Sequence, residues 1–132
     1  TLIALKALAG APAMRASAPA QVGVEMLLRH WAERPKWRPY LFGVGSEFVK
    51  LKYPYVWYDI LHVVEVLSQF PTARGDPRLR EMAAVIRNKA DAEGRYTPES
   101  VWMAWKAWEF GQKRAPSPWL TLLVWRMLAR LA

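Results

Sequence analysis

The chain has 132 residues, a mass of 15.2 kDa, a formal net charge of +8 and a pI near 10.1. With 53% apolar and 23% charged residues, the composition excludes a disordered chain and predicts one folded domain over residues 1–132. The absence of cysteine excludes disulfides and thiolate chemistry, and it leaves the cytoplasm as the default location.

Membrane and polyanion partners are only weakly indicated. The longest uncharged run, residues 115–125, is shorter than the roughly 20 apolar residues that cross a bilayer, so no transmembrane segment is expected. Positive charge attracts polyanions, but basic residues form runs only at residues 34–38 and at Lys113-Arg114. Because the chain opens within a helical pattern, we expect it to be a fragment of a longer protein.

Two helices are predicted in the first third of the chain. Leu2, Leu5 and Leu8 mark a short helix that Gly10 and the following proline end. A second helix is predicted over residues 19–33, with Ser17 as a candidate cap and with His30 at the edge of its buried face. Residues 34–55 show no clean period and predict a long connection, of the kind that is commonly functional.

The remaining helices are marked by apolar spacing and by caps followed by proline. Residues 55–70 predict a third helix, and Asp76-Pro77 begins a fourth that ends before Gly94. Thr97-Pro98 predicts a fifth helix over residues 100–110, although tertiary contacts can remodel so tryptophan-rich a run. Ser117-Pro118 begins a sixth helix that extends to the C-terminus. Six helices joined mostly by short turns predict an all-α fold of stacked antiparallel hairpins.

Four stretches, taken in order, resemble the squalene-cyclase and protein-prenyltransferase-like α/α toroid family, also called the terpenoid cyclase fold. They are VEMLLRHWAER, YPYVWYDILHVVEVL, GDPRLREMAAVIRNKADAEGRY and APSPWLTLLVWRMLARL. Lys89, Asp91, Gly94 and Tyr96 match the family's repeat signature, with Gly-x-Tyr in place of the usual Gly-x-Trp. The resemblance covers residues 20–132 and implies about half of a toroid, completed by a missing part of the chain or by a second copy.

The family's catalytic residues are not found. The resemblance would imply an Asp-rich acid motif in a cyclase, but the three aspartates, Asp59, Asp76 and Asp91, are isolated from one another. It would imply an Asp, Cys and His zinc site in a prenyltransferase, which a chain without cysteine does not reproduce. We therefore expect no cofactor and no metal, and a binding protein rather than an enzyme.

Aromatic residues supply the candidate ligand site. In the family the region that matches Tyr53, Tyr55, Trp57 and Tyr58 faces the central cavity, where aromatic rings contact an isoprenoid chain. The more frequent explanation for such a cluster is core packing at the start of a helix. Trp102, Trp105 and Trp119 complete the predicted ligand wall.

Asp59 and His62 are the weak catalytic candidates. They lie three residues apart on one side of the predicted third helix, where they could transfer a proton or, with Glu65, bind a metal. With no second cluster of ligands elsewhere, a solvated polar stripe is the favoured interpretation.

Trp102, Trp105 and Trp108 recur at every third position, which spreads them over a wide flank of a helix. The flank could be a repeat interface, a pocket wall, or a base-stacking surface for nucleic acid, in that order of preference. For the whole chain, the leading hypothesis is a non-catalytic domain that binds an apolar or isoprenoid-like small molecule or lipid. The alternatives are a protein interaction module, which includes a homo-oligomer, and nucleic-acid binding.

Overall fold

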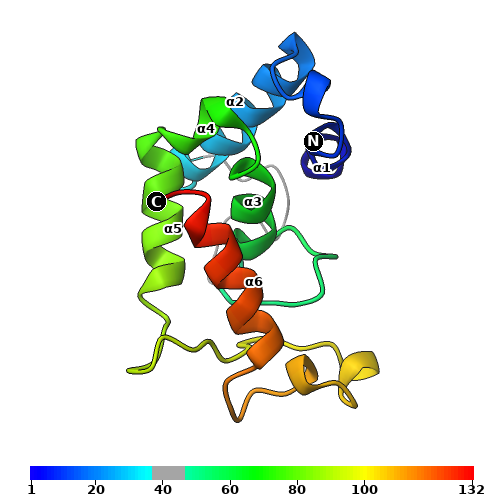
Figure 1. The fold of residues 1–132 in the computed structure, drawn as a ribbon, viewed down its shortest axis with the longest axis vertical. Coiled ribbons are helices and arrows are strands. Elements are labelled where there is room, and N and C mark those ends of the chain that lie inside the picture. The colour runs from blue at the N-terminus through cyan, green and yellow to red at the C-terminus, as the bar shows by residue number, and fades with distance from the viewer. Residues whose placement is uncertain (37–46) are drawn as a thin grey trace.

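The computed structural model describes residues 1–36 and 47–132, and over those residues the fold is all-α (Figure 1). Only one isolated bridge, between Lys52 and Ser100, pairs extended segments in that part of the chain. The elements are α1 (Leu2–Ala9), η1 (Pro12–Met14), α2 (Ala18–Ala32), α3 (Ile60–Leu67), α4 (Pro71–Arg74), α5 (Pro77–Arg87), η2 (Met103–Trp105), η3 (Glu109–Gly111) and α6 (Pro118–Ala129). The predicted all-α class is confirmed.

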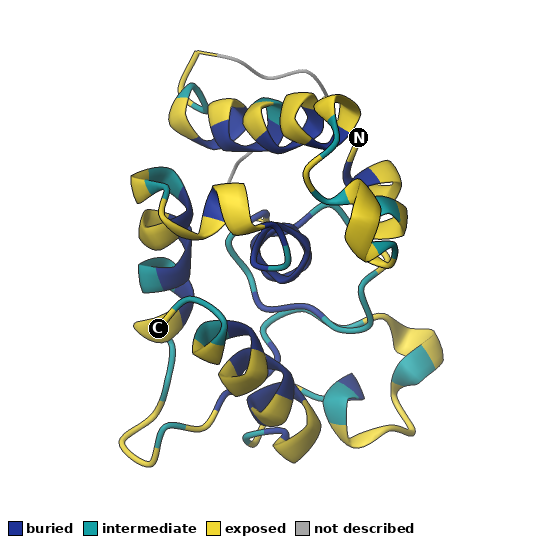
Figure 2. Ribbon diagram, turned by 45° about the horizontal axis from the view of Figure 1, so that its top comes forward, coloured by how far each residue is buried: buried dark blue, intermediate teal, exposed yellow. Residues whose placement is uncertain are grey.

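Helix α3 forms the centre of the molecule. All eight of its residues are buried, and it packs against α1, α5 and α6. Figure 2 shows it nearly end-on and dark blue throughout, with the other helices around it. A helix that is apolar on most of its sides is expected to be surrounded in this way.

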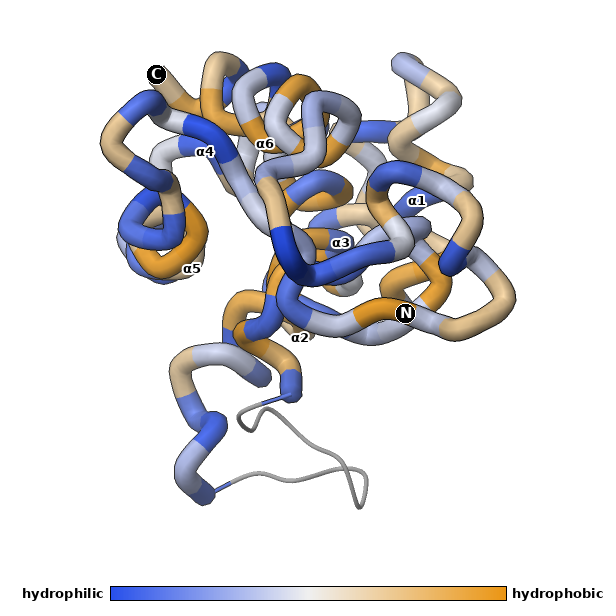
Figure 3. The backbone as a smooth tube through the Cα atoms, turned by 90° about the horizontal axis from the view of Figure 1, so that it is seen from below, coloured by the Kyte–Doolittle hydropathy of each residue, from blue (hydrophilic) through white to orange (hydrophobic). Residues whose placement is uncertain are grey.

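The surrounding helices are amphipathic and turn one face inward. In α5 the buried residues are Leu79, Met82, Ala83 and Ile86, as their spacing predicts. Figure 3 shows this helix with its hydrophilic side outward and its hydrophobic side toward the other helices. Helices α1 and α2 approach closely at Gly23, where an added Cβ would lie 2.9 Å from the Leu5 side chain.

Two predicted helix starts are confirmed by their caps. The Asp76 carboxylate accepts a hydrogen bond from the Arg78 backbone N–H at 2.8 Å, and Pro77 occupies the first position of α5. The Ser117 hydroxyl accepts from the Leu120 backbone N–H at 3.0 Å at the start of α6. At Ser17 the start of α2 is confirmed without the cap, because its hydroxyl donates to the Met14 carbonyl oxygen instead.

The predicted third helix is wrong at both ends. Helix α3 begins at Ile60 and not at residue 55, because Asp59 is extended and its carboxylate accepts the His62 backbone N–H at 3.0 Å. It ends at Leu67, and a separate short helix, α4, follows with Pro71 at its first position. The four aromatic residues of the predicted helix start therefore lie in an irregular segment before α3.

The predicted fifth helix over residues 100–110 is wrong. That segment holds only the two short turns η2 and η3. Its entry is held extended, because the Glu99 and Ser100 backbone N–H groups donate to the Leu51 carbonyl oxygen at 2.9 and 3.4 Å. Within this segment Trp102 packs on Trp57 and Phe110 packs on Tyr53, both from the segment before α3, so tertiary contacts override the local helical signals.

The long connection is only partly described. Residues 37–46 lie outside the described part of the chain, so their predicted irregularity stays a prediction. After that gap Phe48 and Leu51 are buried, and the Phe48 carbonyl oxygen accepts the Ile60 backbone N–H at 2.8 Å. None of the helices within the described residues combines the length and the hydropathy needed to cross a bilayer.

Candidate ligand site

Tyr53 stands at the middle of a set of edge-to-face ring contacts. Its ring centroid lies 5.3 Å from that of Tyr55, 4.8 Å from that of Phe110 and 6.2 Å from that of Trp119. The interplanar angles of 71° to 83° are those of T-shaped pairs, which the ring quadrupoles favour. The connection before α3, the turn η3 and helix α6 therefore meet at this ring.

The ring contacts continue through the tryptophan-rich segment. The Trp57 and Trp102 centroids are 6.5 Å apart, those of Trp102 and Trp105 are 6.4 Å apart, and those of Trp105 and Phe110 are 6.3 Å apart. Trp108 stacks on Phe110 at 5.8 Å. We call this set the aromatic network; it comprises Tyr53, Tyr55, Trp57, Trp102, Trp105, Trp108, Phe110 and Trp119.

The structure thus brings together six of the seven residues predicted to form the ligand wall. Phe110 joins them although the sequence analysis missed it as a site residue. Its position at the end of the tryptophan run was the one available signal, and that signal was assigned to a helix terminus. The network could not be derived from a helical wheel, because Trp119 is the one indole in it that an α-helix presents.

Tyr58, the seventh predicted residue, belongs to a different cluster. Its hydroxyl is 2.6 Å from His30 Nδ1 in a hydrogen bond, and the two rings stack at 5.4 Å. Phe48 lies against the same tyrosine at 5.4 Å and against Trp31 at 6.0 Å. His30 is fully buried and not at a boundary as predicted, and burial lowers the pKa of its imidazole.

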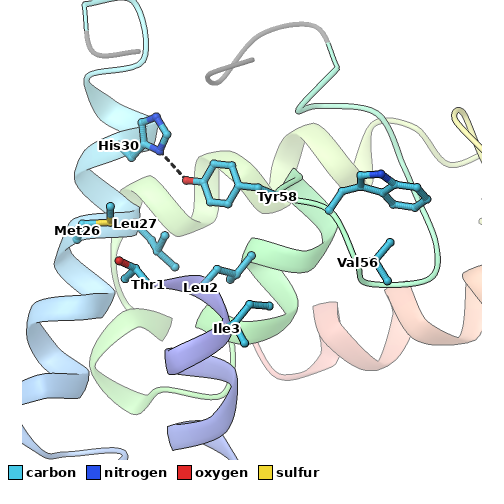
Figure 4. A pocket seen from close by; sticks show the side chains of 9 residues that line it. Thr1, Leu2, Ile3, Met26, Leu27, His30, Val56 and Tyr58 are labelled. Atoms are coloured by element: carbon cyan, nitrogen blue, oxygen red, sulfur yellow. Dashed lines mark hydrogen bonds between the residues drawn. The ribbon is translucent and has the colours of Figure 1, made fainter. Parts of the chain in front are cut away.

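A cavity of about 280 Å³ opens between α1, α2 and residues 56–58 (Figure 4). Its walls are mainly apolar, and Thr1 and the hydrogen-bonded His30 and Tyr58 contribute polar groups to its lining. The lining residues are Thr1, Leu2, Ile3, Met26, Leu27, His30, Val56, Trp57 and Tyr58. Trp57 therefore connects the cavity with the aromatic network.

The α1 and α2 side of this cavity was not predicted from the sequence. Figure 4 shows Ile3 and Leu2 on α1, Met26 and Leu27 on α2, and Val56 on the segment before α3. In the sequence these residues occupy ordinary helix or loop positions, and nothing marks them as ligand residues. Their convergence depends on how α1 packs on α2 and α3, which a single sequence does not specify.

Asp59 and His62 are both fully buried, so the prediction of a solvated polar stripe is wrong. No hydrogen bond joins their side chains: Asp59 Oδ1 accepts from the His62 backbone, and His62 Nδ1 lies 2.9 Å from the Trp57 carbonyl oxygen. The His62 ring also stacks on Tyr55 at 5.3 Å. Burial raises the pKa of Asp59 to about 7 and lowers the pKa of His62.

These pKa directions follow from the cost of burying charge: His62 is mostly neutral near pH 7, whereas Asp59, with a pKa of about 7, is only partly ionised there. Asp59 Oδ2 and His62 Nε2 have no hydrogen-bond partner among the described residues. The two residues therefore stabilise the start of α3 through their other atoms, and their geometry is not that of a proton-transfer pair.

Glu65 serves as an anchor for α6 rather than as a metal ligand. Its carboxylate lies 3.0 Å from Arg130 Nη1 and 3.7 Å from Arg126 Nη2, both on or next to α6. Among the described residues, no three His, Cys, Asp or Glu side chains gather as a metal site requires. Burial, together with the charge of Glu65, raises the pKa of Tyr55.

Comparison with protein-family models, with curated proteins and with solved structures finds no match to this chain. The similarity to the toroid family therefore stays a prediction from the sequence.

Proposed function

We propose that this domain binds an apolar small molecule, of isoprenoid-like shape, in the cavity between α1, α2 and residues 56–58. The observation that carries the proposal is the composition of the cavity wall, which is mainly apolar and comes from three separate segments. Trp57 and Tyr58, which the sequence singles out as ligand residues, lie in that wall. Binding pockets for small molecules have this character: apolar walls with a few placed polar groups.

The size of the cavity limits the ligand. A volume of about 280 Å³ is near the lower limit of typical ligand pockets. It holds about nine groups the size of a water molecule, at roughly 30 Å³ each, which corresponds to the order of two isoprene units. A short terpenoid alcohol suits this space, with its chain on Met26 and Trp57 and its hydroxyl toward the His30–Tyr58 pair.

The proposal extends to the architecture. We infer that the helices form part of an α/α toroid, as the similarity of residues 20–132 to that family implies. In support, α1 packs on α2 and α3 packs on α5, and the predicted Asp91-x-x-Gly94-x-Tyr96 turn follows α5. The family's reactions are not part of the proposal, because the acid motif and the zinc ligands are missing.

Geraniol binding to the purified chain, followed by isothermal titration calorimetry, tests this proposal. Val56→Trp should fill part of the cavity and weaken binding at least tenfold. Val22→Trp is the matched control, because Val22 is 71% exposed on α2 and does not line the cavity. Thermal melting of both variants verifies that they fold.

Two results would count against the proposal. One is the absence of binding for geraniol and for longer terpenoid alcohols alike. The other is an equal affinity for the wild type and for a folded Val56→Trp protein, which would place the ligand elsewhere. Native mass spectrometry of the chain as it comes from cells adds an independent test, because a retained small-molecule mass identifies the ligand class directly.

A further inference from the structure

Six large apolar side chains are exposed within residues 102–125. Each has between 44% and 67% of its surface accessible. We call them the tryptophan surface; they are Trp102, Met103, Trp108, Trp119, Leu122 and Trp125. Figure 1 places the segment around η2 and η3 and the first half of α6 at the same end of the molecule. Surfaces on which several large apolar side chains are exposed together commonly mark interaction sites.

The two halves of this surface are held together by direct contacts. Glu109 Oε1 accepts a hydrogen bond from the Trp119 backbone N–H at 3.2 Å, which joins η3 to the start of α6. The Trp119 ring contacts Tyr53, which contacts Phe110, on which Trp108 stacks. The exposed indoles are therefore fixed on one framework and not carried by independent loops.

A groove extends the tryptophan surface along α6. It has a volume of about 560 Å³ and runs beside Leu122 and Trp125. Its other lining residues are Arg95, Ala115, Pro116, Pro118 and Thr121. The Trp125 indole N–H donates to the Gly94 carbonyl oxygen at 2.8 Å, so one wall of the groove is held in place.

Positive charge is concentrated in the same part of the chain. Residues 95–132 contain six basic and two acidic side chains, a formal charge of +4. Three of the basic residues, Arg95, Arg126 and Arg130, pair with acidic side chains that precede this range. Lys106, Lys113 and Arg114 are exposed, and none of them forms an ion pair within the described residues. Of the two acidic groups, Glu99 pairs with Lys89 at 2.7 Å and Glu109 accepts from the Trp119 backbone.

We propose that the tryptophan surface docks on the surface of an anionic lipid membrane. Tryptophan favours the boundary between headgroups and acyl chains, where its apolar ring is buried and its N–H stays near water. Lys106, Lys113 and Arg114 then lie close to anionic headgroups, each contributing about a fivefold gain in affinity. The proposal does not depend on the terpenoid cavity, which lies between α1 and α2.

Charge and side-chain type favour a membrane over the other occupants. A second copy of this surface would bring two groups of positive charge together, which opposes association. The phosphates of a nucleic acid would complement the positive charge, but its bases bind by stacking on flat aromatic rings. Met103 and Leu122, exposed by 67% and 55%, add aliphatic area that suits acyl chains better than bases.

Co-sedimentation of the full chain with vesicles tests the proposal. The vesicles are an equal mixture of phosphatidylcholine and phosphatidylserine, and vesicles of phosphatidylcholine alone serve as reference. We expect binding to the mixed vesicles that weakens as salt is added. Binding to neutral vesicles should be at least tenfold weaker.

Two pairs of variants separate the contributions of charge and apolar area. The double variant Lys113→Glu and Arg114→Glu should lose at least about 25-fold in vesicle affinity, and Met103→Ser with Leu122→Ser at least about tenfold. The matched controls are Arg80→Glu with Arg87→Glu on α5 and Val22→Ser on α2, all exposed and outside the tryptophan surface. Both controls should bind vesicles within about threefold of the wild type.

Three results would overturn the proposal: no binding to mixed vesicles, equal losses in the controls, or equal binding to both vesicle types that salt does not change. A single-stranded oligouridylate that binds through the same residues, in the absence of vesicle binding, would assign the surface to nucleic acid instead. A dimer that the Met103→Ser and Leu122→Ser changes dissociate, again without vesicle binding, would assign it to a second copy. Melting temperatures establish that each variant is folded.

Discussion

At the scale of single residues, burial determines the behaviour of the polar groups at the start of α3. Asp59 and His62 are fully buried, and burial disfavours the charged form of each. The protonated carboxyl is favoured in one case and the neutral imidazole in the other. The two residues therefore give opposite contributions to the pH dependence of stability, although they are only three positions apart.

Replacing Asp59 by Asn should remove one of these contributions. The folded pKa of Asp59 is about 7, above its ordinary value of 3.8. The contribution of its protonated carboxyl to the free energy of unfolding is therefore complete below about pH 4 and is lost as pH rises through 7. Relative to wild type, Asp59→Asn should therefore gain about 2 to 4 kcal/mol of unfolding free energy between pH 4 and pH 8. Urea unfolding at the two pH values measures this change, and the contribution of His62 cancels in the comparison.

Asp91→Asn provides the control of opposite sign. A hydrogen bond from the Arg95 backbone lowers the pKa of Asp91, so its contribution is present at neutral pH and lost in acid. The Asn variant should therefore be less stable than wild type by a nearly constant amount between pH 4 and pH 8, and this difference should shrink as pH falls below about 4. A pH-independent difference for Asp59→Asn would show that its carboxyl titrates normally in the folded protein.

Gly94 is the one described residue with a positive φ. Its φ of +73° lies in the left-handed region, where a side chain costs about 1 to 2 kcal/mol. Gly94→Ala should destabilise the chain by that amount in chemical denaturation. Gly75→Ala is the matched control: it has negative φ and open space, and it should be neutral or slightly stabilising. Equal effects of the two changes would contradict this explanation.

At the scale of elements, helix starts were predictable where a side chain satisfies the first N–H groups. Asp76 and Ser117 both precede proline and both cap. Thr97 has the same neighbours, but no helix follows it, because residues 99 and 100 are already hydrogen-bonded to Leu51. The capping signal is local, whereas this competing interaction joins residues nearly fifty positions apart, so the sequence pattern alone could not reveal it.

Ser117→Ala and Ser17→Ala should differ, although both serines precede a helix. Ser117 is buried and its hydroxyl caps α6, so its loss should cost about 1 to 2 kcal/mol of unfolding free energy. Ser17 makes no capping bond, so its replacement should cost less than about 0.5 kcal/mol. Denaturant midpoints of the two variants provide the comparison. A larger cost at Ser17 would mean that the α2 start depends on that hydroxyl after all.

At the scale of the whole molecule, the site could be predicted only in part. Six of the seven predicted ligand residues do converge, because aromatic side chains near irregular segments tend to pack together. The cavity depends on the placement of α1 and α2 beside residues 56–58, which is a property of helix packing and not of any local pattern. The apolar sequence of α3 is typical of a central helix, but the burial of its Glu65 could not be predicted, because it depends on Arg126 and Arg130 lying beside it.

The contacts of α3 lead to a prediction about cooperativity. Because α1, α5 and α6 all pack on this helix, residues 1–132 should unfold as one unit, as the single-domain prediction requires. Leu67→Ala removes a fully buried side chain from α3 and should cost about 2 to 5 kcal/mol. Amide hydrogen exchange should then lose protection in α1, α5 and α6 together. Leu122→Ala, at a residue 55% exposed, should change stability by less than about 0.5 kcal/mol. Loss of protection confined to α3 and α5, with α1 unchanged, would instead divide the chain into two units and would separate the cavity beside α1 and α2 from the unit that contains α3.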